Sequence, residues 1–287
     1  MAVHDGDGIR TTVFFKGCPL KCVWCHNPEG ISFNTQLAFY KEKCISCTAC
    51  AKACRYGAIK MGEKHPIIDN SLCTGCGDCS EKCPADAIKL YGEDWTVEAL
   101  AEELLRDKPF FDSSGGGVTL SGGESLAQPE FAIALAKNLF LKGVSVDIDT
   151  CGLASRDTLE KIAPYVDTFL YDIKAINRDV HIRCTANDNA VIIENLKYLC
   201  ESGQKIEVRY PYVKGYNSDE CEAIGRFLST LSGISGVKVL KYHSFADSKY
   251  EALGMEDTLP DVTVTDDDIS EAVNILKSFG LNAFSDN

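Results

Sequence analysis

Short runs of apolar, often β-branched residues alternate along most of the chain with longer segments whose apolar residues recur every three or four positions. The short runs predict strands and the longer segments predict amphipathic helices, because these two periods match the two kinds of element. Helices are expected over residues 96–107, which Pro109 follows, and over residues 129–141, which Gly143 follows. The alternation indicates a parallel α/β fold with helical crossovers. Strands are expected at residues 11–16, 118–120, 144–148, 168–171, 206–208 and 237–240.

Polar residues follow every one of the six predicted strands. In parallel α/β barrels the carboxyl ends of the strands gather at one mouth, where such proteins carry their chemistry. Each residue alone has a structural explanation, such as a turn, a surface ion pair or a core histidine, but six polar ends at one mouth favour a binding site. A loop with three cysteines follows the first strand, and the later strands are followed by Gly122, Gly123 and Glu124, by Asp149, by Asp172, Ile173 and Lys174, by Arg209, and by His243.

The 287 residues include 29 Lys and Arg against 42 Asp and Glu, which gives a net charge of −13 at pH 7. Because the chain has no basic block, it lacks the charge that binds a phosphate backbone, and nucleic acid is not an expected partner. No apolar run reaches the ~18 residues that a membrane span needs. Fifteen cysteines without a signal peptide indicate reduced, metal-binding thiols in the cytoplasm rather than disulfides.

Two groups of cysteines repeat the spacing C-x2-C-x2-C-x3-C, and Ala-Ile-Lys follows each group. This spacing is that of bacterial two-cluster ferredoxins, in which the fourth cysteine of each run binds the other cluster. Structural zinc is the alternative, although zinc sites usually use pairs of Cys or Cys with His. We therefore expect two 4Fe–4S clusters, one on Cys44, Cys47, Cys50 and Cys83 and the other on Cys73, Cys76, Cys79 and Cys54.

A third group, Cys18, Cys22 and Cys25, has the spacing C-x3-C-x2-C and supplies only three ligands. A four-iron cluster held by three thiolates keeps one iron open, and an open metal position can chelate a small molecule. The spacing resembles the signature of the radical S-adenosylmethionine (radical SAM) superfamily. Trp24 stands where that superfamily places an aromatic ring near the adenine, and His26 is expected to brace the loop.

The polar strand ends suit an amino-acid sulfonium such as S-adenosylmethionine. Glu124 can accept hydrogen bonds from its ammonium group, and Arg209 or Lys174 can bind its carboxylate. His243 can reach the ribose or the edge of the adenine. Asp149 and Asp172 can share a cation or position a loop, and the sequence alone leaves both roles open.

Over nearly its whole length the chain resembles the activating enzymes of glycyl radical enzymes, in particular the subgroup with an inserted ferredoxin-like domain. The resemblance implies a partial (β/α)6 TIM-like barrel, formed by residues 1–40 and 92–287, and a two-cluster ferredoxin-like domain at residues 41–91. The matching segments are HDGDGIR at residues 4–10, FKGCPL at 15–20, CVWCHNPE at 22–29, SSGGGVTLSGGE at 113–124, DTCG at 149–152, YDIK at 171–174 and Tyr242-His243.

The resemblance also implies roles for individual residues. It places Cys18, Cys22, Cys25 and Lys174 in catalysis, and it makes Asp5 a contact to the glycine loop of the partner. The pocket around the methionine group is then formed by Gly122, Gly123, Glu124, Asp172, Ile173, Lys174, Arg209 and His243, with a monovalent cation between Asp149 and Asp172.

The reaction implied is reductive cleavage of S-adenosylmethionine to methionine and a 5′-deoxyadenosyl radical, which removes hydrogen from a backbone glycine of a partner glycyl radical enzyme. A flavodoxin- or ferredoxin-type protein is the expected electron donor. Two other functions stay open on the residues alone: a radical SAM enzyme that acts on a small molecule, and a plain electron carrier that uses only the eight-cysteine segment. Cys200 and Cys221 are expected to be small buried hydrophobic residues in helices.

Overall fold

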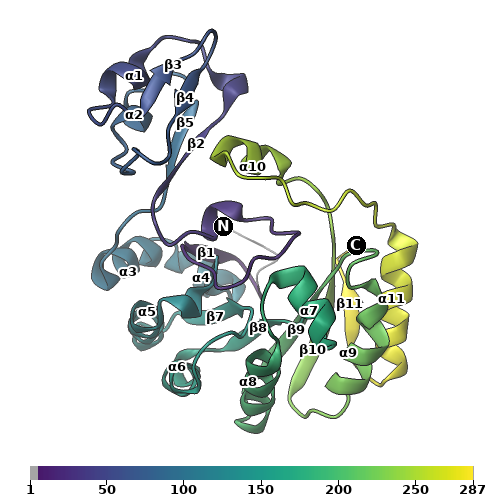
Figure 1. The fold of residues 1–287 in the computed structure, drawn as a ribbon. Coiled ribbons are helices and arrows are strands. Elements are labelled where there is room, and N and C mark those ends of the chain that lie inside the picture. The colour runs from purple at the N-terminus through teal and green to yellow at the C-terminus, as the bar shows by residue number, and fades with distance from the viewer. Residues whose placement is uncertain (1–5, 287) are drawn as a thin grey trace.

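A seven-stranded parallel sheet forms the centre of the computed structural model, which describes residues 6–286 (Figure 1). The strand order is β1-β6-β7-β8-β9-β10-β11, so that β1 and β11 are the two edges. All six predicted strands are confirmed. The seventh strand, β11, was not predicted, because it has only three residues and no apolar run. The strands are β1 (Arg10–Phe15), β6 (Gly117–Gly122), β7 (Ser145–Thr150), β8 (Thr168–Asp172), β9 (Ile206–Tyr212), β10 (Ile234–Lys241) and β11 (Ala283–Ser285).

Helices connect successive strands and cover the outer face of the sheet, where Phe15 packs edge-on against Phe131 at 5.9 Å between ring centres. The helix predicted at 129–141 is found at those residues, and the one predicted at 96–107 begins after Thr96, whose side chain caps the amide of Ala99. The helices are α3 (Val97–Leu105), α4 (Lys108–Ser114), α5 (Pro129–Leu141), α6 (Arg156–Ile162), α7 (Arg178–Thr185), α8 (Ala190–Glu201), α9 (Cys221–Leu228), α10 (Asp247–Leu253) and α11 (Asp266–Ser278).

The inner face of the sheet is polar even where it is buried. Arg10 is 1% exposed, donates to the Thr119 hydroxyl at 2.8 Å, and forms an ion pair with Asp147 at 3.2 Å. Burial raises the pKa of Asp147 to about 6, and the charge of Arg10 opposes that shift. An inner face built in this way is suited to hold a polar ligand.

Residues 36–91 form a separate small lobe, drawn above the sheet in Figure 1. Its stem is the antiparallel pair β2 (Gln36–Phe39) and β5 (Ile88–Tyr91), so the structural unit begins slightly before residue 41. The lobe also contains a hairpin, β3 (Ile59–Met61) with β4 (Pro66–Ile68), and two short helices, α1 (Ala49–Ala53) and α2 (Asp78–Glu81). It has its own small core, formed by Leu37, Cys50, Ile59, Cys79 and Ile88.

Short 3-10 turns complete the fold: η1 (Pro28–Gly30), η2 (Lys41–Lys43), η3 (Ser125–Ala127), η4 (Ala163–Tyr165) and η5 (Ser218–Glu220). Among residues 6–286 no helix combines the length and the apolarity needed to cross a membrane.

Candidate active site

The cysteine loop, residues 16–31, starts where β1 ends and packs directly on the end of β6. The Gly17 amide donates to the Gly30 carbonyl at 2.8 Å, and the Glu124 amide donates to the Gly17 carbonyl at 2.8 Å. A Cβ atom on Gly123 would lie 2.2 Å from the Gly30 oxygen and 2.6 Å from that of Gly17. Glycine is therefore required at position 123 because backbone approaches backbone there.

The middle of the cysteine loop is held by the end of α7. The amides of Lys21 and Val23 donate to the carbonyls of Thr185, at 2.9 Å, and Cys184, at 3.0 Å. The Asn187 side chain donates to the carbonyl of Pro19 at 2.7 Å. These backbone contacts fix the loop without using the cysteine side chains, which leaves the thiols for ligands.

Helix α10 holds the far end of the cysteine loop. The Lys249 ammonium donates to the Glu29 carboxylate at 2.6 Å and to the His26 carbonyl at 3.0 Å, and the Tyr250 hydroxyl donates to the Cys25 carbonyl at 3.1 Å. The same helix packs Leu253 against Ala38 in the stem of the lobe. Neither Lys249 nor Tyr250 belongs to a recognisable motif, so these contacts could not be predicted from the sequence.

The three thiols lie in a largely buried setting close to one cation. Burial raises the pKa of Cys18 to about 11 and that of Cys22 to about 12, and the charge of Lys174 opposes both shifts. Burial also raises the pKa of Cys25, and Lys174 again acts against it. Metal ions bind the thiolate form and reverse such shifts, so three largely buried thiols close to one cation fit an iron–sulfur cluster.

Two acid–base pairs stand at the carboxyl ends of β7 and β8, and one of them uses Arg209, which lies within β9 and not after its end as predicted, because β9 continues to Tyr212. Lys174, whose side chain is 8% exposed, contacts the Asp172 carboxylate at 2.7 Å. Burial lowers the pKa of Lys174, but the carboxylate of Asp172 and the thiol of Cys22 outweigh this and raise it well above its usual value. Arg209 lies 3.6 Å from Asp149 and pairs in register with Asp172. The structural alternative for Asp172 and Lys174, an ion pair on the surface, is correct as to the pair, but Lys174 is buried and Asp172 is partly buried.

Glu124 is fully engaged in holding strand ends together. Its carboxylate accepts from the Thr150 hydroxyl at 2.8 Å, from the Leu126 amide at 2.9 Å and from the Cys151 amide at 2.8 Å. Burial raises its pKa, and these donors oppose the shift. The thiol of Cys151 is a fourth donor to this carboxylate, so the roughly four acceptor positions of a carboxylate are all used inside the protein.

His26 and His243 stack on each other, with 4.1 Å between ring centres and 14° between planes. The His26 ring also contacts the His243 carbonyl at 2.6 Å, which braces the loop as expected. His243 is exposed, so the alternative of a core histidine is wrong. Unlike His243, Trp24 is buried, and its ring lies edge-on to that of Tyr216 with 6.5 Å between ring centres.

Other residues singled out from the sequence have the following positions. Ile173 is buried, and its amide donates to the Arg209 carbonyl at 2.9 Å. Cys200 and Cys221 are buried in α8 and α9, as expected. Asp5 lies outside the residues that the structure describes.

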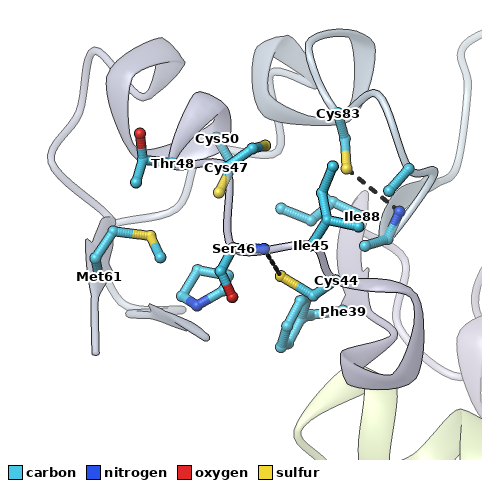
Figure 2. Close-up of a pocket in the computed structure, with 13 residues that line it drawn as sticks. Phe39, Cys44, Ile45, Ser46, Cys47, Thr48, Cys50, Met61, Cys83 and Ile88 are labelled. Atoms are coloured by element: carbon cyan, nitrogen blue, oxygen red, sulfur yellow. Dashed lines mark hydrogen bonds between the residues drawn. The ribbon is translucent and has the colours of Figure 1, made fainter. Parts of the chain in front are cut away.

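In the lobe, four cysteines line one small cavity: Cys44, Cys47, Cys50 and Cys83 (Figure 2). Figure 2 shows Cys83 reaching this cavity from the second cysteine run, while Cys44, Cys47 and Cys50 come from the first. In residues 6–286 no three His, Cys, Asp or Glu side chains converge on a position for a single metal ion.

Comparison with known proteins places the chain in a family. The model of the radical SAM superfamily matches residues 12–228. The trans-4-hydroxy-L-proline dehydratase activating enzyme of Clostridioides difficile is 42% identical over 257 residues, which cover 88% of this chain and 85% of that protein. The chain is a glycyl radical enzyme activating enzyme of the radical SAM superfamily. The choline trimethylamine-lyase activating enzyme of Oleidesulfovibrio alaskensis is a further relative, 38% identical over 88% of this chain and 84% of its own.

Among solved structures, a domain of the pyruvate-formate lyase-activating enzyme from Bacteroides vulgatus aligns with a TM-score of 0.51 and 26% identity, over 60% of this chain and all of that one. The predicted family and function are thereby confirmed. As a radical SAM activating enzyme, the chain uses a 4Fe–4S cluster and S-adenosylmethionine to generate a 5′-deoxyadenosyl radical that activates a partner enzyme.

Proposed function

We propose that Cys18, Cys22 and Cys25 hold the 4Fe–4S cluster and that S-adenosylmethionine binds between it and the ends of β6 to β10. The observation that carries this proposal is the position of Lys174, which pairs with Asp172 while its charge acts on all three thiols. When bound, the cluster supplies the electron that cleaves the sulfonium, and the nucleoside radical takes a hydrogen atom from a glycine of the partner.

The residues of the chain bind and orient the methionine group. Lys174 and Arg209 offer cations to its carboxylate, and Glu124 positions the ends of β6 and β7 against it. A monovalent cation between Asp149 and Asp172 would compete with these two basic side chains. The proposal therefore assigns the two carboxylates to Arg209 and Lys174.

The partner that we propose is a glycyl radical dehydratase or lyase, because three relatives are named as activating enzymes of trans-4-hydroxy-L-proline dehydratase, choline trimethylamine-lyase and isethionate sulfite-lyase. The test incubates the reconstituted chain anaerobically with S-adenosylmethionine, a reductant and each of these three enzymes. We expect a glycyl radical on at least one of them by electron paramagnetic resonance (EPR). Formation of 5′-deoxyadenosine without a protein radical on any of the three would instead favour a small-molecule substrate.

The lobe is proposed to be a ferredoxin-like domain that carries two further 4Fe–4S clusters. One would bind to the cysteines that line the cavity of Figure 2, which lies beside Phe39 and Ile88 at the outer end of the stem. The other would bind to Cys73, Cys76, Cys79 and Cys54. The loop of this second set reaches the inner end of the stem, since a Cβ on Gly75 would lie 2.1 Å from the hydroxyl oxygen of Thr35.

This order suggests that electrons pass from a flavodoxin- or ferredoxin-type donor to the outer cluster, then to the inner one, then to the cysteine loop. Three register positions separate the two ends of the stem, or about 10 Å at ~3.3 Å per residue. The variants Cys47→Ser and Cys76→Ser remove one ligand from the outer and inner sets respectively.

Both variants should keep S-adenosylmethionine binding and lose flavodoxin-driven turnover. A reduced inner cluster should speed the electron-spin relaxation of the cluster in the cysteine loop. This effect should be lost only in Cys76→Ser, which removes a ligand of the inner cluster. Unchanged turnover in both variants would show that the lobe only docks a partner, and iron content below three clusters in the parent protein would reject the assignment of clusters.

A further inference from the structure

A groove of about 950 Å³ runs along the open edge of β1. We call it the β1 groove. It is lined by residues 12–16, which form the end of β1 and the residue after it, and by residues 90–95, which run from the end of β5 out of the lobe. Phe33 and Thr35 also line it. Its floor includes Gly122 and Asn27, so the groove is continuous with the end of β6 and with the cysteine loop.

Three large aromatic side chains are exposed along this one groove: Phe14 is 61% exposed, Phe33 60% and Trp95 42%. Single exposed apolar residues are common, but a group of them in a hollow indicates a binding surface. Phe14 lies in register with Ser121, whose hydroxyl donates to the Asp149 carboxylate at 2.7 Å. The aromatic surface therefore begins directly beside the proposed S-adenosylmethionine site.

The backbone of Phe14 faces this open edge of the sheet. The carbonyl of Ile9 accepts from the amide of Gly117 in β6 at 3.2 Å, and that of Phe15 accepts from Gly123, directly after β6, at 2.8 Å, so the odd-numbered residues face β6. Backbone groups alternate in direction along a strand, so the amide and carbonyl of Phe14 face the groove. Within residues 6–286 no strand pairs with β1 on that side. Extended peptides bind such edges by adding a strand, with pockets for alternate side chains.

Once the contacts inside the groove are counted, its net charge toward a ligand is negative. Its two lysines are already used, because Lys16 donates to the Glu29 carbonyl at 2.6 Å and Lys249 pairs with the Glu29 carboxylate. The second carboxylate oxygen of Glu29 is buried without a hydrogen-bond partner. Glu93 and Asp94 stand exposed on the rim. A peptide that carries Lys or Arg among apolar residues complements this surface.

From these observations we infer that the β1 groove binds an extended segment of the partner glycyl radical enzyme, with apolar and aromatic side chains and at least one Lys or Arg. This inference rests on the proposed function, since the glycine of the partner must reach the site beside the groove. A segment paired with β1 would deliver the following chain to the ends of the strands.

The test measures binding of the reconstituted chain to the same three enzymes, trans-4-hydroxy-L-proline dehydratase, choline trimethylamine-lyase and isethionate sulfite-lyase. The chain has two tryptophans, and Trp24 is buried, so a shift of emission to shorter wavelength on binding reports on Trp95. Phe14→Ser and Glu93→Lys should each weaken binding, Phe14→Ser by at least about tenfold. Matched controls are Phe140→Ser and Glu160→Lys, two exposed residues on helices α5 and α6.

The variants should form 5′-deoxyadenosine from S-adenosylmethionine at the parental rate, which shows that the site itself is intact. Binding that is unchanged in both groove variants, or weakened equally in the controls, would overturn the inference. If no enzyme of the three binds, the inference is rejected for this class of partner. If binding depends on the groove residues but no protein radical forms, the proposed function is rejected and the inferred binding role of the β1 groove stands.

Discussion

Gly123→Ala is the substitution that tests most sharply how the end of β6 supports the cysteine loop. The added Cβ would lie 2.2 Å from the Gly30 carbonyl oxygen, whereas real Cβ contacts essentially never fall below 3.0 Å. The loop must therefore retreat by about 0.8 Å. The hydrogen bond from the Glu124 amide to Gly17, now 2.8 Å, would stretch toward 3.6 Å, beyond hydrogen-bond range.

Losing this bond and its neighbours costs about 2–4 kcal/mol, because each buried group left without a partner costs about 1–3 kcal/mol. The assay is iron content after anaerobic reconstitution, together with the EPR change on adding S-adenosylmethionine. We expect about one cluster per chain to be lost or to stop responding to S-adenosylmethionine. Gly143→Ala is the control, since nothing lies within 4 Å of its Cβ position and only its positive φ of 68° adds strain. Equal occupancy and response in both variants would refute the reasoning.

Three further substitutions test other parts of the site. Asp147→Asn should remove a pH dependence, because burial raises the pKa of Asp147 from 3.8 to about 6. The unfolding free energy of the parent should fall relative to that of the variant by about 3 kcal/mol as pH rises from about 3 to 7. Parallel thermal melts in which the two proteins do not diverge over this range would show that the shift is absent. Lys249→Met should speed loss of iron to a chelator, whereas Lys142→Met, an exposed control, should not. Lys174→Met should weaken S-adenosylmethionine binding at least about tenfold in equilibrium dialysis. The Asp172 carboxylate, which lies 2.7 Å from the Lys174 ammonium, would then repel the carboxylate of the ligand. An unchanged affinity would exclude Lys174 from the site.

The strands could be predicted from the sequence because their buried outer faces place apolar residues at every second position, as at Val118 and Leu120 or at Val146 and Ile148. The residues of the strand ends could be predicted too, since parallel topology brings them to one edge. The sequence pattern did not predict the contacts that each of these side chains makes. Glu124 serves chiefly as an internal tie between β6 and β7.

Long-range contacts explain the other omissions. Lys249 and Tyr250 act on residues more than 200 positions away along the chain, and no local period reports such a contact. Trp24 lies in the cysteine motif, yet its burial against Tyr216 depends on the loop after β9. The stem strand β2 was likewise hidden, because its partner β5 comes about fifty residues later and a short strand without a neighbouring partner gives a weak signal.

The most direct test of the central claim is the EPR spectrum of the reduced, fully reconstituted chain before and after addition of S-adenosylmethionine. Binding at the iron that the three cysteines leave open should change the spectrum of one cluster and leave the signals of the lobe unaltered, and replacement of Cys22 by Ala should abolish the response. A spectrum that is identical with and without S-adenosylmethionine, in protein with complete iron content, would contradict the account.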